Sequence, residues 1–362
     1  YEEIDRFIKR THKWSRPQRV RTDLINIPGK SIRIPEPLGT CLIIGAWNYP
    51  YNISLIPAVS AIAAGNTVII KPSEVPAKTS EVMADLINNY LNTKHIAVVE
   101  GGIPETSELL SYKWDKIFFT GSPKVGKIVY QKAAEQLIPV TLELGGKSPT
   151  FITKSANLKI TVQRLVWAKF LNAGQTCIAP DYVYVDQTIK AEFLKLLQEE
   201  ITKRSYTYGS EHYGQIIDNK NIQRLKRLID QSKVVYGGEV DEQKRYIKPT
   251  VLDDVTWEDK VMQEEIFGPI LPILTYYILQ EAVKEVIQQD KPLSCYVYTE
   301  DKQDAKLVLD QVSFGGGMVN DSVTHFSNAR LGFGGIGNSG MGSYHGKFGF
   351  DTFTHYKGVI KK

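Results

Sequence analysis

The sequence has few cysteines and little excess of charge of either sign. Three cysteines, Cys41, Cys177 and Cys295, form no C-x-x-C pair, so neither a disulfide framework nor a structural zinc site is favoured. The 44 Lys and Arg against 40 Asp and Glu give a net charge of +4 over 362 residues, which offers no global attraction to nucleic acid or an acidic membrane. A 42% hydrophobic content excludes disorder and rod-like folds, and the length allows two or three domains.

One long stretch, residues 37–70, contains no charged side chain, and that length suggests a membrane span. Seven interrupting residues argue against it: Gly45, Asn48, Pro50, Asn52, Pro57, Gly65 and Asn66. Apolar strands at 40–45 and 67–70, separated by a small-residue helix at 54–64, are typical of a parallel sheet buried on both faces. We therefore expect no membrane span.

Strands and helices continue to alternate beyond this stretch, with expected strands at 96–99, 116–119 and 140–144 and helices at 106–110 and 123–135. This spacing is typical of doubly wound nucleotide-binding domains. Before it, Pro28-Gly29 predicts a hairpin with strands at 22–27 and 31–34. After Gly146 a second α/β block follows, with helices at 158–172, 191–201 and 222–229 and strands at 182–185, 270–274, 294–298 and 317–319. Residues 331–349 are rich in glycine and predict a long ordered loop.

The chain opens on Tyr1 rather than Met, inside what is predicted to be an amphipathic helix. We therefore expect that the natural start, and any targeting segment, precede this residue.

Cys177 lies in a loop bounded by Gly174 and Pro180, between an expected helix and an expected strand. A thiolate nucleophile must be accessible, as such a loop allows. A lone cysteine is more commonly a small buried hydrophobic side chain. Cys41 and Cys295 fit that second interpretation because both lie inside apolar strands, whereas both interpretations stay open for Cys177.

Glu143 closes an apolar strand and is followed by two glycines. This position predicts the carboxyl edge of a sheet, where α/β folds bind ligands. Partial burial there raises the pKa of a carboxyl group and makes it a usable general base. The alternative is a solvated charge at the end of a strand.

Four other segments are weak signals individually. The amide of Asn48, in Trp47-Asn48-Tyr49-Pro50, is able to donate a hydrogen bond to a developing oxyanion. Lys71 and Glu74 either hold the hydroxyls of an adenosine ribose or pair with each other in water. Residues 119–126 predict a strand, turn and helix whose small residues let a pyrophosphate approach the helix N-terminus, and residues 264–269 form an acidic and aromatic turn before a strand.

In combination and in this order, the segments resemble the aldehyde dehydrogenase superfamily. The matching motifs are Trp47-Asn48-Tyr49-Pro50, Gly65-Asn66 with Lys71-Pro72-Ser73-Glu74, Phe119-Thr120-Gly121-Ser122, Glu143-Leu144-Gly145-Gly146-Lys147-Ser148-Pro149, Gly174-Gln175-Thr176-Cys177 and Glu264-Glu265-Ile266-Phe267-Gly268-Pro269. Residues 246–250 and 339–347 narrow the resemblance to class 3-like members. The resemblance runs from near Arg16 almost to the C-terminus.

The resemblance implies a role for each matching residue. Cys177 is the expected nucleophile, Asn48 and the backbone N–H of Cys177 the oxyanion hole, and Glu143 the base that activates water. The expected cofactor-binding residues are Trp47, Lys71, Glu74, Gly121, Ser122, Val125, Gly126, Leu144, Glu265 and Phe267. Among them, Lys71 and Glu74 are expected to hold the adenosine ribose, and Ser122 with its turn is expected to hold the pyrophosphate. Glu265 and Phe267 are expected to contact the nicotinamide ribose and ring.

It also implies an α/β fold with two Rossmann-like, doubly wound parallel-sheet domains and a small β bridging element. We expect an NAD-binding domain at 1–15 and 39–145 that is N-terminally incomplete, since family members begin several dozen residues earlier. A catalytic domain is expected at 146–330, and a bridging hairpin and strand at 16–38 and 348–362 that form a homodimer.

The expected function is oxidation of a medium-chain, long-chain or aromatic aldehyde to its acid in the cytoplasm, with no nucleic acid as partner. NAD is the expected cofactor, with NADP possible, because Glu74 repels a ribose 2′-phosphate. We expect no metal, since none of the six histidines has a His or Cys three to five residues on; His345 is interpreted as structural.

Three alternatives stay open. A CoA-acylating dehydrogenase is disfavoured by the base at Glu143, which the hydrolytic type needs. A cysteine esterase uses the same thioester chemistry, and an inactive truncated member keeps the fold alone.

One motif departs from the pattern of the family. The Pro-Phe-Gly-Gly that is usual there appears as Gly332-Phe333-Gly334-Gly335, which lowers backbone restraint in that loop.

Overall fold

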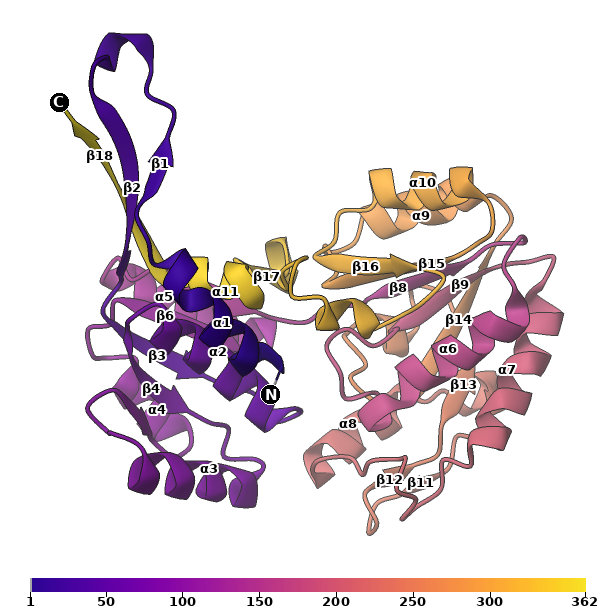
Figure 1. Cartoon of the computed structure of the whole chain (residues 1–362). Helices are drawn as coiled ribbons and strands as arrows, with labels where there is room; N and C mark the ends of the chain where they lie inside the picture. Colours follow the sequence, from indigo (N-terminus) through magenta and orange to yellow (C-terminus); the bar gives the residue numbers. More distant parts are fainter. Residues whose placement is uncertain (1) are drawn as a thin grey trace. The chain divides into compact units, whose positions relative to one another are not determined.

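A computed structural model describes residues 2–362, which form two compact units, each with its own sheet (Figure 1). Unit 1 contains the described chain through Glu143, then Asn328–Gly334 and Met341–Lys362, and unit 2 contains Leu144–Ser327 and Gly335–Gly340. Tyr1, which opens the predicted N-terminal helix, lies outside the described residues, and α1 (Glu2–Trp14) begins at the next residue. The α/β fold class is confirmed, while the division into a cofactor and a catalytic domain stays a prediction.

Unit 1 is built on parallel strands in the order β7-β6-β3-β4-β5, with the short β17 (Gly340–Met341) beside β7. Their bounds are β3 (Thr40–Ile44), β4 (Thr67–Lys71), β5 (Ile96–Val98), β6 (Lys116–Thr120) and β7 (Val140–Glu143). The connecting helices are α2 (Pro50–Ala63), α3 (Ala77–Tyr90), α4 (Ile103–Leu109) and α5 (Pro123–Glu135). The uncharged stretch therefore folds as predicted into β3, α2 and β4, with proline at the first position of α2, where its fixed φ suits a helix start.

Helices α1 and α11 (Gly346–Thr352) complete the core of unit 1 through aromatic contacts. Phe7 is 2% exposed, and its ring meets Trp14 edge-on at a centroid distance of 5.5 Å. Trp14 in turn lies 5.6 Å from the ring of Phe350 in α11. Two ends of the chain that are far apart in sequence are thus joined by one apolar cluster.

The predicted hairpin exists, but its first strand was placed wrongly. β1 (Gln18–Val20) pairs with β2 (Lys30–Pro37), and residues 22–27 instead contain the 3-10 turn η1 (Leu24–Asn26). Asn26 donates through its side chain to Asp23 Oδ1 at 2.6 Å and through its backbone N–H to Asp23 O at 3.2 Å. This local bonding competes with a strand ladder. Within residues 2–362 no opposing layer buries the apolar tip, since Leu24 is 87% exposed.

The hairpin continues into a three-stranded antiparallel sheet, β1-β2-β18, through β18 (Thr354–Lys361). Figure 1 shows this sheet extending away from the parallel sheet of unit 1.

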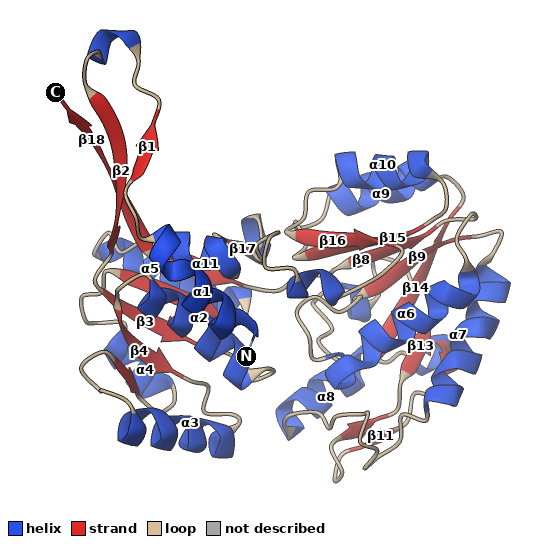
Figure 2. Cartoon of the chain, viewed as in Figure 1, coloured by secondary structure: helices blue, strands red, loops and turns tan. Residues whose placement is uncertain are grey.

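Unit 2 contains seven strands in the order β10-β13-β14-β9-β8-β15-β16, all parallel except β10. The bounds are β8 (Pro149–Ile152), β9 (Tyr182–Asp186), β10 (Val234–Tyr236), β13 (Thr250–Leu252), β14 (Ile270–Tyr276), β15 (Ser294–Tyr298) and β16 (Gly316–Val319), with a separate pair β11 (Val240–Asp241) and β12 (Tyr246–Ile247). The helices are α6 (Leu158–Phe170), α7 (Lys190–Arg204), α8 (Asn219–Leu228), α9 (Leu279–Ile287) and α10 (Lys302–Gln311). Figure 2 shows α9 and α10 on one face of this sheet and α6 and α7 on the other, a doubly wound arrangement.

We predict that Phe7→Ala destabilises the protein by about 3–5 kcal/mol, because it leaves a cavity among buried aromatic rings. The matched control is Ile8→Ala on the same helix, where the side chain is 74% exposed and the expected change is within about 0.5 kcal/mol. Urea-induced unfolding measures both. Equal losses in the two variants would contradict the packing role of Phe7.

Candidate active site

The predicted site residues of unit 1 follow the carboxyl ends of neighbouring parallel strands. Trp47 and Asn48 are half-buried in the segment after β3, and Gly121 and Ser122 follow β6. The chain leaves β3 toward β4 but leaves β6 toward β7, so the connections diverge between these two adjacent strands. Such a switch point is where open α/β sheets bind ligands.

Ser122 is the N-cap of α5, and its hydroxyl accepts a 3.4 Å hydrogen bond from Val125 N. Val125 is 42% exposed, whereas Gly126 is buried and presents no side chain on the first turn. The N-terminus of this 13-residue helix therefore offers N–H groups and a positive dipole end to an anion such as a pyrophosphate.

Lys71 ends β4 and is buried at 2% exposure. Its ammonium donates to Pro72 O at 2.6 Å and lies 3.8 Å from the carboxylate of Glu74, whose side chain is half exposed. Burial lowers the pKa of Lys71, and the Glu74 charge opposes that shift. Of the two interpretations of this pair, mutual pairing is present, and the exposed carboxylate of Glu74 still faces solvent, where a ribose hydroxyl is able to reach it.

Glu143 ends β7 and is 2% exposed. Neither of its carboxylate oxygens has a hydrogen-bond partner within residues 2–362. Burial raises the pKa of this carboxyl well above its usual value of 4.5. The side chain is therefore not a solvated strand-end charge but a desolvated carboxyl, the state in which a carboxylate is a strong base.

Cys177 lies in unit 2, between the 3-10 turn η2 (Leu171–Gly174) and β9, and is half-buried. The side chain of Gln175 anchors this loop: it donates to Asn172 O and Gln215 O, both at 3.0 Å, and accepts from Ile217 N at 2.9 Å. On the far side of the thiol, Tyr296 donates its hydroxyl hydrogen to Ile178 O at 2.6 Å. The loop that carries Cys177 is thus held on both sides of this residue.

Gly174 precedes this loop in a left-handed conformation, with φ of +74°. A Cβ at this position would lie 2.3 Å from Gly268 O. The loop and the segment that carries Glu265 and Phe267 therefore approach too closely for any residue but glycine.

The other two thiols differ from Cys177, as predicted. Cys41 is 0% and Cys295 2% exposed. Burial raises the pKa of Cys41 to about 12 and that of Cys295 also well above its usual value. A neutral buried thiol is inert, whereas Cys177 is only half-buried.

Glu265 and Phe267 belong to a turn before β14, here named the Glu264–Gly268 turn. The carboxylate of Glu265 lies against the glycines that follow Glu143, because a Cβ on Gly145 would come within 2.1 Å of Oε2. Burial, with Asp181 next in effect, raises the pKa of Glu265 to about 8. Leu144, at the start of the same segment, is 7% exposed.

Sequence reasoning assigned no role to Asp181, which joins these segments. Its Oδ2 is 2.5 Å from Lys147 Nζ and its Oδ1 accepts from Ile266 N at 2.9 Å. Lys147 also donates to Glu264 O at 2.9 Å. The available signal was a carboxylate directly before an apolar strand, where a charge needs a partner.

The remaining expectations concern other parts of the chain. His345 is 9% exposed and its ring lies 4.4 Å from that of Tyr344, a packed position. Residues 2–362 contain no cluster of three His, Cys, Asp or Glu side chains able to hold a metal ion. In the same range, no helix is both long and apolar enough for a bilayer crossing.

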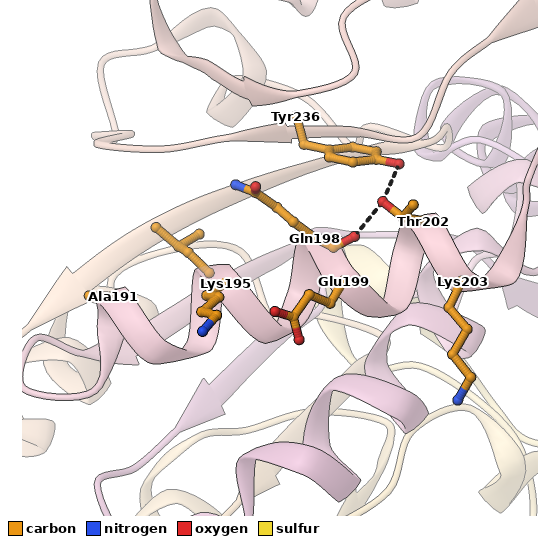
Figure 3. Close-up of a pocket in the computed structure, with 8 residues that line it drawn as sticks. Ala191, Lys195, Gln198, Glu199, Thr202, Lys203 and Tyr236 are labelled. Atoms are coloured by element: carbon orange, nitrogen blue, oxygen red, sulfur yellow. Dashed lines mark hydrogen bonds between the residues drawn. The ribbon is translucent and has the colours of Figure 1, made fainter.

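A pocket on the surface of unit 2 contains none of the predicted residues (Figure 3). It is lined by α7 and Tyr236, whose hydroxyl lies 3.1 Å from Thr202 Oγ1, which in turn donates to Gln198 O at 2.8 Å. Lysines and a glutamate alternate along this face of α7, as on an ordinary solvated helix surface.

Unit 1 has a sheet edge and a helix N-terminus suited to an anion, and unit 2 has a half-buried cysteine in a loop. Each feature is typical of a nucleotide-linked oxidoreductase with a reactive cysteine. Known proteins make this specific: the model of the aldehyde dehydrogenase family matches residues 5–359. The chain is 48% identical over 361 residues to 4,4'-diaponeurosporen-aldehyde dehydrogenase of Staphylococcus aureus, covering 98% of this chain and 78% of the relative. It is 44% identical over 366 residues to the dimeric NADP-preferring aldehyde dehydrogenase of Rattus norvegicus, covering 100% and 80%.

Solved structures agree. The substrate-bound state of Staphylococcus aureus AldH superposes with a TM-score of 0.96 at 47% identity, covering 100% of this chain and 80% of that one. Mycobacterium tuberculosis aldehyde dehydrogenase complexed with NAD+ gives a TM-score of 0.89 at 28% identity, covering 100% and 77%. The chain belongs to the aldehyde dehydrogenase family, and the class 3-like resemblance is confirmed. It is an oxidoreductase that acts on small-molecule aldehydes, oxidising them to carboxylic acids with NAD(P)+.

We predict that the buried carboxyl of Glu143 makes the protein less stable as pH rises. The folded state holds this proton to a higher pH than the unfolded state, where the pKa is near 4.5, so stability falls from about pH 4.5 upward. The melting temperature of Glu143→Gln should therefore equal that of the wild type near pH 4. At pH 8 it should exceed the wild-type value by about 2 °C or more.

The control is Glu81→Gln on α3, whose exposed carboxylate is hydrated in both states. Its melting difference from wild type should not change with pH. If the melting-temperature difference between Glu143→Gln and the wild type became smaller as pH rises, the protein would be stabilising the charged carboxylate, contrary to the prediction.

Proposed function

We propose that Cys177 is the nucleophile, that Asn48 and the backbone N–H of Cys177 hold the oxyanion, and that Glu143 activates the hydrolytic water. The observation that carries the proposal is the contrast among the thiols: Cys177 is half-buried in an anchored loop, while Cys41 and Cys295 are sealed in the cores. The desolvated carboxyl of Glu143 supports its role as base. A base at this position also disfavours CoA as acyl acceptor.

The residues act in two stages. The Cys177 thiolate adds to the aldehyde carbon, and the carbonyl electron pair moves to an oxygen that the Asn48 amide stabilises. A bound NAD(P)+ would supply the hydride acceptor that the conversion of the Cys177 thiohemiacetal to a thioester requires. Glu143 then takes a proton from water, whose oxygen attacks the acyl carbon, and the C–S bond breaks to return the Cys177 thiolate and release the acid.

The residues of unit 1 fit a dinucleotide. The α5 N-terminus, capped by Ser122 and kept open by Gly126, suits the pyrophosphate, with Gly121 and Val125 beside it. Lys71 and Glu74 suit the adenosine ribose, and Trp47 lies in the loop of Asn48. Leu144, Glu265 and Phe267 are proposed as further cofactor-binding residues on the family resemblance alone. NAD is favoured over NADP because the Glu74 carboxylate repels a 2′-phosphate, although the rat relative is named as NADP-preferring.

Substrate and assembly follow the same resemblance. We propose a medium-chain, long-chain or aromatic aldehyde as substrate; the Staphylococcus aureus relative is named for 4,4'-diaponeurosporen-aldehyde. A homodimer in the cytoplasm is proposed, with the β1-β2-β18 sheet as its bridging element, since the rat relative is named as dimeric. The exposed apolar tip at Leu24 and Ile25 is consistent with an interface.

Cys177→Ala should abolish both NAD(P)-dependent oxidation of aldehydes and nucleotide-independent cleavage of an activated ester, because both need the same thiolate. The measurements are nicotinamide absorbance over a panel of aldehydes with each nucleotide, and release of p-nitrophenol from its acetate. Cys41→Ala, a buried thiol, is the control and should retain both activities. Turnover that survives in Cys177→Ala would remove the nucleophile assignment, and a wild type that cleaves esters without oxidising any aldehyde would favour an esterase.

Glu143→Gln should slow steady-state turnover by about 100-fold or more, the range of general-base catalysis, while a first-turnover burst of NADH remains. The reason is that the base acts only after the thioester has formed. Stopped-flow absorbance separates the burst from the steady state. Loss of the burst would place Glu143 before the thioester.

A further inference from the structure

The Glu264–Gly268 turn has a conformation that needs support from outside. Phe267 adopts φ of +47°, in the left-handed region that side-chain-bearing residues rarely occupy. Such a conformation persists only where surrounding contacts fix it. The neighbours of the turn therefore decide where Glu265 and Phe267 point.

Helix α8 supplies one set of these contacts through Arg224. Its guanidinium donates to Ile266 O at 2.8 Å and, over a longer 3.4 Å, to Glu265 O. The same group pairs with Glu264 Oε1 at 3.0 Å. The Glu264 side chain is 47% exposed, so this ion pair contributes little, whereas the two carbonyls belong to the peptides on either side of Ile266.

Packing adds to the hydrogen bonds. A Cβ on Gly268 would lie 2.4 Å from Leu225 Cδ2, so α8 and the turn are in direct contact where a side chain has no room. Arg224 and Leu225 are consecutive in α8, and they hold the turn before and after Phe267. Because the guanidinium is planar and forked, it spans adjacent carbonyls in a way that a lysine ammonium does not.

A second set of contacts to the turn comes from Asp181, which follows the loop of Cys177, and from Lys147. Asp181 Oδ1 accepts from Ile266 N at 2.9 Å, and Lys147, paired with Asp181, donates to Glu264 O. Asp181 is four residues from Cys177 and bonds through its own N–H to Ser148 O. A change at Asp181 therefore disturbs the nucleophile loop and the turn together, whereas Arg224 contacts the turn from α8.

We propose that Arg224 is a positioning residue for the cofactor half of the reaction. Arg224 fixes the Glu264–Gly268 turn so that Glu265 and Phe267 meet the nicotinamide ribose and ring. This inference rests on the roles proposed for those two residues. The nucleophile loop has its own anchors in Gln175 and Tyr296. Loss of Arg224 should therefore impair the nucleotide-dependent step and leave the thiol chemistry intact.

The test is Arg224→Met, which keeps the length and apolar stem but removes the donors. We expect the KM for NAD+ to rise about tenfold and the NADH burst rate to fall about tenfold, because the site loses preorganisation. Nucleotide-independent ester cleavage by Cys177 should stay within about twofold, since its geometry is set elsewhere. Arg227→Met, at an exposed position on the same helix, is the control and should leave all three quantities unchanged.

Asp181→Asn provides the contrast, because it should lower ester cleavage and the nucleotide-dependent rate together. Parallel loss of both activities in Arg224→Met would show a general structural role and overturn the proposal, as would no change in either. Phe267→Ala separates the two levels of the argument. An unchanged KM for NAD+ in Phe267→Ala would remove the role proposed for the ring. The result for Arg224→Met tests the separate claim that Arg224 positions the turn.

Discussion

The parallel pairing of β3 with β4 on one side and β6 on the other decides where unit 1 can carry polar side chains. A parallel strand covered by helices on both faces has no solvated side, so charge and hydrogen-bonding groups are confined to its ends. The carboxyl ends of such strands share one edge of the sheet. Asn48, Lys71, Ser122 and Glu143 are separated by up to 95 residues of sequence, and strand polarity alone assigns them to that edge.

The residues of unit 2 that are proposed for the reaction precede their strands rather than follow them. Cys177 precedes β9 and Glu265 precedes β14, and these neighbouring parallel strands begin side by side. Side-chain contacts join the two segments that precede these strands. Asp181 makes these contacts, since one buried carboxylate bonds both Lys147 and the backbone of the turn. Oδ2 forms the ion pair and Oδ1 accepts the hydrogen bond. These two contacts offset the free-energy cost of removing the carboxylate from water.

Sequence reasoning succeeded where one local signal was sufficient. Helix α5 covers the predicted residues 123–135, because Pro123 starts it and Ser122 caps it. Apolar strands such as β3 and β15 were equally plain. It failed at residues 22–27, where the Pro28-Gly29 turn signal suggested a hairpin strand but the Asp23–Asn26 turn, and the lack of a covering layer within residues 2–362, favoured a 3-10 turn.

Other features depend on contacts that periodicity does not reveal. Helix α3 was missed because it is apolar on two sides, with Met83 buried and Leu86 53% exposed, so no clean amphipathic period appears. At the site, the motif residues were recognisable from the sequence, but their supports were not. Arg224 and Asp181 resemble any surface charge until the fold brings the Glu264–Gly268 turn against them.

Glu143 is in a state that selection for stability alone would not favour. A carboxyl group with no partner within residues 2–362 loses hydration without gaining a hydrogen bond, which destabilises its charged form. The same desolvation makes the carboxylate, once formed, a stronger acceptor for a proton from water than a hydrated glutamate. A hydrogen-bond donor beside it would stabilise the fold at neutral pH but would lower its basicity. The absence of such a donor among the described residues is therefore consistent with the role proposed for Glu143 as the base, and its strand β7 is held in the sheet by pairing with β6.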